Sequence, residues 1–198
     1  LPAKITAGTG MDALSHSLEA WCSPFFHPLS AGIALEGMRL VKDWLPKAVK
    51  DGKDITARSQ MLIASSMGAV AFQKGLGAMP AMSHPSSSLC GTHHGLTNAV
   101  VMPYVLAFNA GAIEEKLAAA ARYLDLPGQS ATSFVDWVLA IREELGIPHT
   151  LKEIGVDESV LPEAARMAEL DPSTGGNPVP VVAADYEVLF RNAINGRL

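Results

Sequence analysis

The stretch LSAGIALEGMRLVKDWLPKAV, residues 29–49, carries the pattern that decides the fold class. Its apolar side chains recur at helical spacing and form one broad stripe, which is typical of an amphipathic helix packed on a core. The dipeptide Asp51-Gly52 follows and predicts where this helix ends. The stripe consists of Ile33, Leu35, Met38, Leu40, Val41 and Leu45.

The same helical pattern continues on both sides of this stretch, and no alternating strand pattern of useful length interrupts it. We therefore expect one all-α domain of roughly eight to ten helices over residues 1–198. Thr9 and Asp54 are suitable caps for two of these helices. The remaining predicted helices are Met11–Cys22, Ile55–Phe72, Leu96–Phe108, Ala112–Leu124, Thr132–Leu145, Pro162–Glu169 and Asp185–Ile194.

Two segments have an unusual composition. The predicted helix Ile55–Phe72 is rich in Ala, Ser and Gly, which lets neighbouring helices approach closely, so we expect it at the centre of the domain. The segment Gly75–Gly95 has no sustained period and contains Pro80 and Pro85. We expect there a short helix broken by the prolines, followed by a loop.

The composition indicates a globular protein, with 48% hydrophobic and 18% charged residues. A net charge of −5 without a basic patch argues against a nucleic-acid partner. No uninterrupted apolar run reaches the roughly 20 residues that a membrane span needs. Cys22 and Cys90 are too few for a disulfide framework, and Leu1–Lys4 lacks signal-peptide anatomy, so we expect reduced thiols and a cytoplasmic location.

The first candidate site lies on the predicted helix after Thr9. Asp12 and His16 are four residues apart, which places both side chains on one helix face, where they can hold one divalent cation. A capped or solvated helix face is the alternative interpretation. The small or apolar neighbours, such as Gly8 and Leu14, favour a buried helix start, where a carboxylate needs a partner.

The second candidate site contains His84, His93 and His94 in the unusual segment. Histidine is the commonest metal ligand and the usual acid or base near neutral pH, although a structural role with backbone partners is also open. A carboxylate combined with imidazoles suits Fe²⁺ or Zn²⁺ better than Ca²⁺ or Mg²⁺. His27 and His149 adjoin prolines in loops, and we expect both at the surface.

These two segments resemble the metal motifs of the iron-containing (group III) alcohol dehydrogenases. The stretch TGMDALSHSLEA, residues 9–20, is similar to the first motif of the family. His84-Pro85 and THHGLTNAV, residues 92–100, are similar to the second. The resemblance covers essentially the whole chain and implies the C-terminal helical domain of such enzymes, which is a dehydroquinate synthase-like helical domain.

The resemblance also implies roles for single residues. It places Asp12, His16 and His94 at metal-ligand positions and His84 near the nicotinamide and substrate, as a candidate for proton relay. The remaining ligand of the family is a histidine four residues before His84, where this chain has Pro80. Proline cannot ligate a metal through its side chain, so we expect metal binding to be weak or absent.

Family members bind NAD or NADP in an N-terminal domain through a glycine-rich turn, and this sequence has no such motif. We therefore expect a C-terminal domain cut from a longer chain, with the nucleotide-binding domain absent. The implied activity is metal-assisted hydride transfer between a small alcohol or aldehyde and the cofactor. We expect the isolated chain to be inactive and to form a homodimer. The alternatives are a non-catalytic helical interaction domain and a helical metal-dependent hydrolase.

Overall fold

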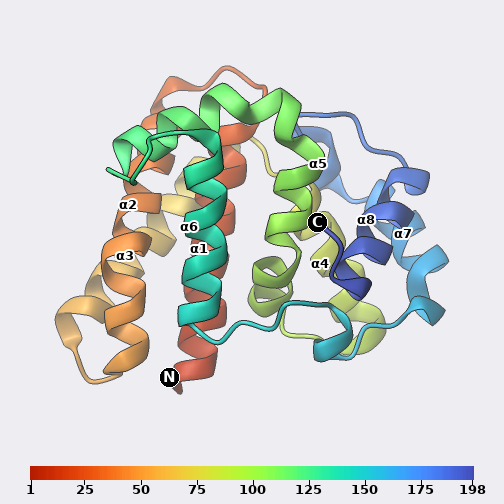
Figure 1. The fold of residues 1–198 in the computed structure, drawn as a ribbon, viewed down its shortest axis with the longest axis horizontal. Helices are drawn as coiled ribbons and strands as arrows, with labels where there is room; N and C mark the ends of the chain where they lie inside the picture. The colour runs from red at the N-terminus through yellow and green to blue at the C-terminus, as the bar shows by residue number, and fades with distance from the viewer.

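The computed structural model describes residues 1–198 and contains eight α-helices, four short 3-10 helices and no strand (Figure 1). The predicted all-α class is confirmed. The α-helices are α1 Ala3–Cys22, α2 Pro28–Lys50, α3 Ile55–Ala71, α4 Ala78–Cys90, α5 His94–Tyr123, α6 Ala131–Glu144, α7 Leu161–Glu169 and α8 Ala183–Asn195. The 3-10 helices are η1 Phe72–Lys74, η2 Lys152–Ile154, η3 Glu158–Val160 and η4 Pro172–Gly176.

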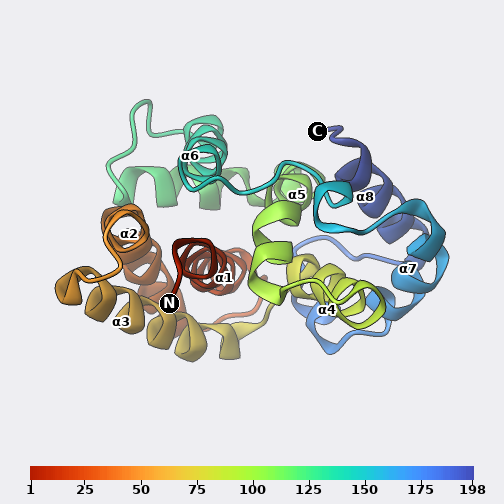
Figure 2. The same ribbon diagram turned by 90° about the horizontal axis from the view of Figure 1, so that it is seen from below.

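Helix α1 runs through the middle of the molecule (Figure 2). It packs against α2, α3 and α5, while α4, α7 and α8 form a second group that joins the first mainly through α5. One continuous apolar cluster of 44 buried residues draws members from all eight α-helices. A single shared core of this kind makes the chain one domain.

Helix α1 begins earlier than its periodicity predicts, at Ala3. Thr9 is therefore inside the helix and caps nothing. Its hydroxyl donates instead to the Ile5 carbonyl within the helix, at 2.9 Å. The predicted cap at Asp54 is confirmed, because its carboxylate accepts a hydrogen bond from Ala57 N at 2.9 Å.

Helix α3 lies at the edge of the domain, so its expected central position is wrong. Its small residues do permit close approach, since a Cβ added at Gly68 would lie 3.2 Å from the Cβ of His16. Only one face of α3 makes such contacts, however, with α1 and α2. The other face leaves Leu62 71% exposed and Ile63 48% exposed. Small residues therefore indicate a close contact but not burial on all sides.

Helix α4 is continuous, so the expected break at the prolines is wrong. Pro80 is the third residue of the helix, where a backbone N–H has no partner within the helix and its loss costs nothing. Pro85 is tolerated inside the helix. The helix ends at Cys90, and Gly91 follows in the left-handed region with φ 68°, which leaves a connection of only three residues.

Helix α5 joins two segments that were expected to be separate helices, because Gly111 between them does not interrupt it. By length and composition alone, α5 passes the test for a membrane-spanning helix. In its most apolar window 67% of residues are buried inside the protein, and the core helix of a soluble protein passes the same test.

Candidate metal centre

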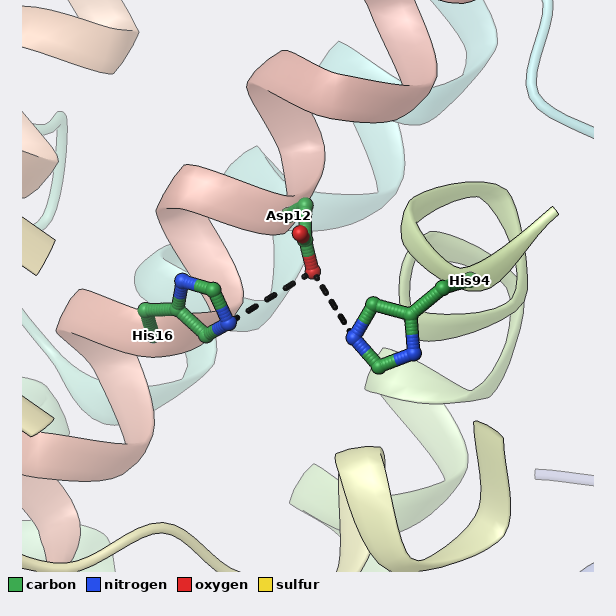
Figure 3. Close-up of side chains that lie close together, drawn as sticks. All are labelled: Asp12, His16 and His94. Atoms are coloured by element: carbon green, nitrogen blue, oxygen red, sulfur yellow. Dashed lines mark ion pairs between the residues drawn. The ribbon is translucent and has the colours of Figure 1, made fainter. Parts of the chain in front are cut away.

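Three predicted ligands meet where α1 crosses the start of α5. Asp12 and His16 lie one turn apart on α1, and His94 is the first residue of α5 (Figure 3). The Asp12 Oδ1 atom lies 3.8 Å from His16 Nε2 and 3.6 Å from His94 Nε2. One potential ligand atom from each residue lies within 4.8 Å of the others. The two distant segments are thus brought together as the sequence indicates.

Gly95 allows α5 to start so close to α1. A Cβ added at Gly95 would lie 2.6 Å from the Gly8 carbonyl oxygen and 2.9 Å from the Asp12 Cβ. Neither the backbone oxygen nor the helix itself can move away easily, so only glycine fits at position 95. This close crossing is what carries the adjacent His94 to Asp12.

Ser83 on α4 determines which nitrogen of His94 is free. The serine hydroxyl donates to the His94 carbonyl at 3.0 Å and lies 2.8 Å from the ring Nδ1. A hydroxyl has one proton, so Nδ1–H is the donor in the second contact and the lone pair is on Nε2. Burial lowers the pKa of His94, which favours this neutral form. The Nε2 lone pair therefore faces Asp12.

Asn98 belongs to the same polar cluster, although no role was predicted for it from the sequence. Its Nδ2 donates to Asp12 Oδ1 at 2.7 Å and lies 3.0 Å from His94 Nε2. Its own Oδ1 is buried without a hydrogen-bond partner. Asn98 follows His94 by one helical turn, and that spacing was the available signal. The amide places a partial positive charge between two acceptors, where a cation would be favoured.

The cluster is partly exposed, although the small residues around it in the sequence suggested full burial. The side chains of His16, Asp12 and His94 are 20%, 22% and 34% exposed. On the α3 side, the ring of His16 meets Phe72 edge to face, with centroids 5.4 Å apart. Four cavities of 210 to 400 Å³ lie elsewhere and are lined by other residues. The three ligands are therefore on an accessible face of the domain.

His84, the predicted proton relay, lies beside the cluster but not in it. Its ring stacks on that of His94, with centroids 5.1 Å apart and planes at 14°. Its Nδ1 lies 2.6 Å from Asp171 Oδ2, and half of the side chain is exposed. Asp171 was not predicted as a partner of His84, because 87 residues separate the two. Only its position before Pro172-Ser173, typical of a local cap, was visible in the sequence.

Two long-range side chains hold the first turn of α4. The Glu19 carboxylate accepts hydrogen bonds from Gly77 N and Met79 N, each at 2.8 Å. Asn177 Oδ1 accepts one from Ala78 N at 3.2 Å. Burial raises the pKa of Glu19 to about 7. Neither residue was identified in the sequence as a support of α4, and a carboxylate at the end of an apolar helix was the only signal.

The other histidines have structural positions. His27 and His93 are exposed caps of α2 and α5, and their Nδ1 atoms accept hydrogen bonds from backbone N–H groups at 3.2 and 3.3 Å. His149 is exposed in a loop. The expected surface positions of His27 and His149 are confirmed. Cys22 and Cys90 are free thiols, as expected.

The donor set fits a divalent transition metal. One carboxylate and two imidazoles, with at least one lone pair directed at the carboxylate, match the ligands that Fe²⁺ and Zn²⁺ take in proteins. A fourth imidazole is not available, because position 80, in the first turn of α4, is a proline. The residues present therefore make a three-ligand site with at least one open position.

Comparisons with known proteins show which family the chain belongs to. The model of the family described as "Fe-containing alcohol dehydrogenase family, C-terminal" matches residues 6–194. A 4-hydroxybutyrate dehydrogenase of Cupriavidus necator is 38% identical over 98% of this chain and 53% of its own length. An NAD-dependent methanol dehydrogenase of Bacillus methanolicus is 36% identical over 98% of this chain and 52% of its own length.

Solved structures show the same correspondence. A 1,3-propanediol oxidoreductase superposes with a TM-score of 0.93 at 34% identity, over 98% of this chain and 53% of that one. An iron-containing alcohol dehydrogenase from Thermococcus thioreducens gives a TM-score of 0.90 at 32% identity, over 99% and 52%. The chain spans about half the length of these relatives. It belongs to the Fe-containing alcohol dehydrogenase family and corresponds to the C-terminal domain of its members.

Proposed function

We propose that this chain is the metal-binding domain of a nicotinamide-dependent alcohol dehydrogenase that acts on a small alcohol or aldehyde. The observation that carries the proposal is the meeting of Asp12, His16 and His94, whose potential ligand atoms lie within 4.8 Å of one another. The family membership of the chain supports it. The printed names of the relatives, with 4-hydroxybutyrate, methanol and 1,3-propanediol, suggest the substrate class.

Each residue has a distinct part in this proposal. Asp12, His16 and His94 would hold Fe²⁺ or Zn²⁺, which when bound supplies a Lewis acid that lowers the pKa of the alcohol. Ser83 keeps the His94 ring in the tautomer that can ligate. His84, stacked on His94 and half exposed, would move the alcohol proton to water. The nicotinamide, which accepts the hydride, would be bound by a domain outside these 198 residues.

The affinity for metal would be low, because the fourth ligand position of the family is Pro80. We propose a cytoplasmic protein without nucleic-acid or membrane partners. We also propose that it forms a homodimer. The exposed apolar side chains on the outer face of α3 support self-association, which gel filtration with light scattering would detect.

A non-catalytic helical interaction domain is the second candidate function. Pro80 favours it, because the loss of a ligand is the first step expected when a metal site decays. The exposed apolar face of α3 is compatible with it as well. The two candidates differ in one measurable property, which is specific binding of a divalent metal at the three ligands.

Titration of the purified chain with Co²⁺, whose visible absorption reports its ligands, tests the proposal. We expect a saturable absorption that Zn²⁺ displaces and that His94→Ala and Asp12→Asn abolish. His149→Ala is the matched control, because this exposed loop histidine should leave the titration unchanged. A titration that is equal in all four proteins would reject the metal site and favour the interaction domain.

A further inference from the structure

The Asp171 carboxylate is the closest polar partner of His84. It comes from the start of η4, yet its Oδ2 lies 2.6 Å from His84 Nδ1. The carboxyl group is 11% exposed, whereas the histidine is 50% exposed. Asp171 is therefore the buried and fixed partner of this pair, and the His84 ring lies at the surface beside it.

The surroundings of Asp171 hold its carboxylate in one orientation. Its second oxygen, Oδ1, accepts a hydrogen bond from Ser173 N at 2.8 Å and so caps η4. The next turn of η4 is anchored in turn, because Thr174 Oγ1 donates to the Ala168 carbonyl at 2.7 Å and lies 2.6 Å from Tyr186 OH. A carboxylate held in this way is already oriented before it meets the imidazole.

The charge of Asp171 determines the direction of the hydrogen bond to His84. Burial alone would raise the pKa of Asp171, but the hydrogen bonds from His84 and Ser173 outweigh it and leave the pKa below its usual value. An ionised carboxylate can only accept, so the His84 Nδ1 must donate. The lone pair of the neutral ring is then on Nε2. Stacking on His94 restrains the plane of the same ring.

We propose that Asp171 is a positioning residue for His84, which holds the ring against His94 in its Nδ1–H form and leaves Nε2 as the single proton acceptor. The use of that acceptor for the alcohol proton rests on the proposed function. The tautomer and the placement of the ring do not depend on it, and they can be measured without metal, cofactor or turnover.

Nitrogen-15 NMR of the metal-free chain gives the direct test, because the shifts of the two ring nitrogens show which one carries the proton. His84→Asn identifies the signals of His84. We expect the Nδ1–H form in the wild-type chain and, in Asp171→Asn, a shift toward the Nε2–H form that free imidazole side chains prefer. An Nε2–H form in the wild-type chain, or an unchanged tautomer in Asp171→Asn, would overturn the proposal.

Two further variants separate this role from a structural one. Asp157→Asn is the matched control, since Asp157 caps η3 through Ser159 N as Asp171 caps η4, but has no contact with His84. It should leave the His84 signals unchanged. Asp171→Ser retains a residue able to cap η4 and removes the carboxylate. It should fold and give the same tautomer shift as Asp171→Asn, and a wild-type tautomer in this variant would also overturn the proposal.

The Co²⁺ titration distinguishes a failure of this inference from a failure of the proposed function. Asp171→Asn should bind Co²⁺ as the wild-type chain does, because Asp171 and His84 lie outside the ligand cluster. A loss as large as that in His94→Ala would place the pair in the ligand set and reject the positioning role. Absence of Co²⁺ binding in the wild-type chain would reject the proposed metal site, and the tautomer measurement would stand separately.

Discussion

At the scale of single residues, two neighbours on α4 act on the same ring. Ser83 holds His94 by hydrogen bonds at its Nδ1 and carbonyl, and His84 stacks on its face. The position of the His94 ring therefore depends on α4 as well as on α5. Loss of a hydrogen-bonding partner of a ligand, here the Ser83 hydroxyl, typically lowers metal affinity by about 10- to 100-fold.

Position 80 is where a fourth ligand could be restored. Pro80 lies in a helix that is already formed, one turn before His84 and on the same face, so an imidazole there needs no refolding of the backbone. We expect Pro80→His to raise the Co²⁺ affinity by about tenfold or more. The new backbone N–H has no acceptor ready, so the metal-free variant should be less stable by about 1–3 kcal/mol.

A histidine elsewhere on α4 controls for non-specific binding. Leu89→His places it on the opposite, exposed face of the helix and should not change the affinity. The comparison needs Co²⁺ titration and thermal unfolding of each variant with and without metal. Equal affinity in Pro80→His and the wild-type chain would mean that position 80 does not face the three ligands.

At the scale of elements, the ends of helices near the site are completed by distant side chains. Glu19 and Asn177 accept the first N–H groups of α4. At the C-terminus of α1, Lys74 donates a hydrogen bond to the Ala20 carbonyl at 2.8 Å, and Lys116 donates one to the Cys22 carbonyl at 2.9 Å. Cations at a helix C-terminus also interact favourably with the helix dipole. The Glu19 contact joins α1, which carries Asp12 and His16, to α4, which carries His84, and the Lys116 contact joins α1 to α5.

The buried Glu19 carboxyl group makes the free energy of unfolding depend on pH. Its pKa is about 7 in the folded protein because it is buried, against 4.5 for an unperturbed glutamate. A raised folded pKa means that the stabilisation is fully present below about pH 4.5 and is lost as the pH rises through about 7. We expect the contribution of Glu19 to the free energy of unfolding to fall by about 3 kcal/mol across this window.

Urea unfolding at several pH values between 4.5 and 8 measures this contribution as the difference between wild type and Glu19→Gln. The difference should change with pH, because glutamine does not titrate. Glu163→Gln on α7 is the control, since this exposed carboxyl has a pKa lowered by Arg166 and should not titrate in the window. Parallel curves for wild type and Glu19→Gln would refute the raised pKa.

At the scale of the whole molecule, the three ligands lie on an accessible face and not in an enclosed pocket. The cavities of 210 to 400 Å³ are lined by other residues. The outer face of α3, beside His16, exposes Leu62 and Ile63. A metal site whose ligands are partly exposed has no means of its own to exclude water or to orient a nicotinamide. This is consistent with a domain that covers half the length of its relatives.

We therefore expect no alcohol dehydrogenase activity from the 198-residue chain alone. Positioning two reactants can supply roughly 7–11 kcal/mol of the barrier reduction, and these residues contain no nucleotide-binding strand-turn-helix to provide it. The assay follows the absorbance of the reduced cofactor with NAD or NADP and a panel of short alcohols, with and without Fe²⁺ or Zn²⁺. Turnover that His84→Ala abolishes would show that this domain recruits the cofactor unaided.

The sequence by itself determined the all-α class, most helix spans and the meeting of Asp12, His16 and His94. Side-chain periodicity is a local property, so it predicts helices and the shared face of Asp12 and His16 directly. The meeting with His94 was implied by resemblance to the family motifs. Its role and that of His84 in binding and catalysis stay predictions.

Only the tertiary structure decided which distant residues support the site. Asp171 reaches His84 across 87 positions, and Glu19 reaches Met79 across 60, because helix packing brings their backbones together. The continuity of α4 was also decided there, since Pro80 has no N–H to satisfy and its neighbours find acceptors on other segments. Contacts of this kind depend on how helices cross, and no periodic pattern along the chain records the crossing.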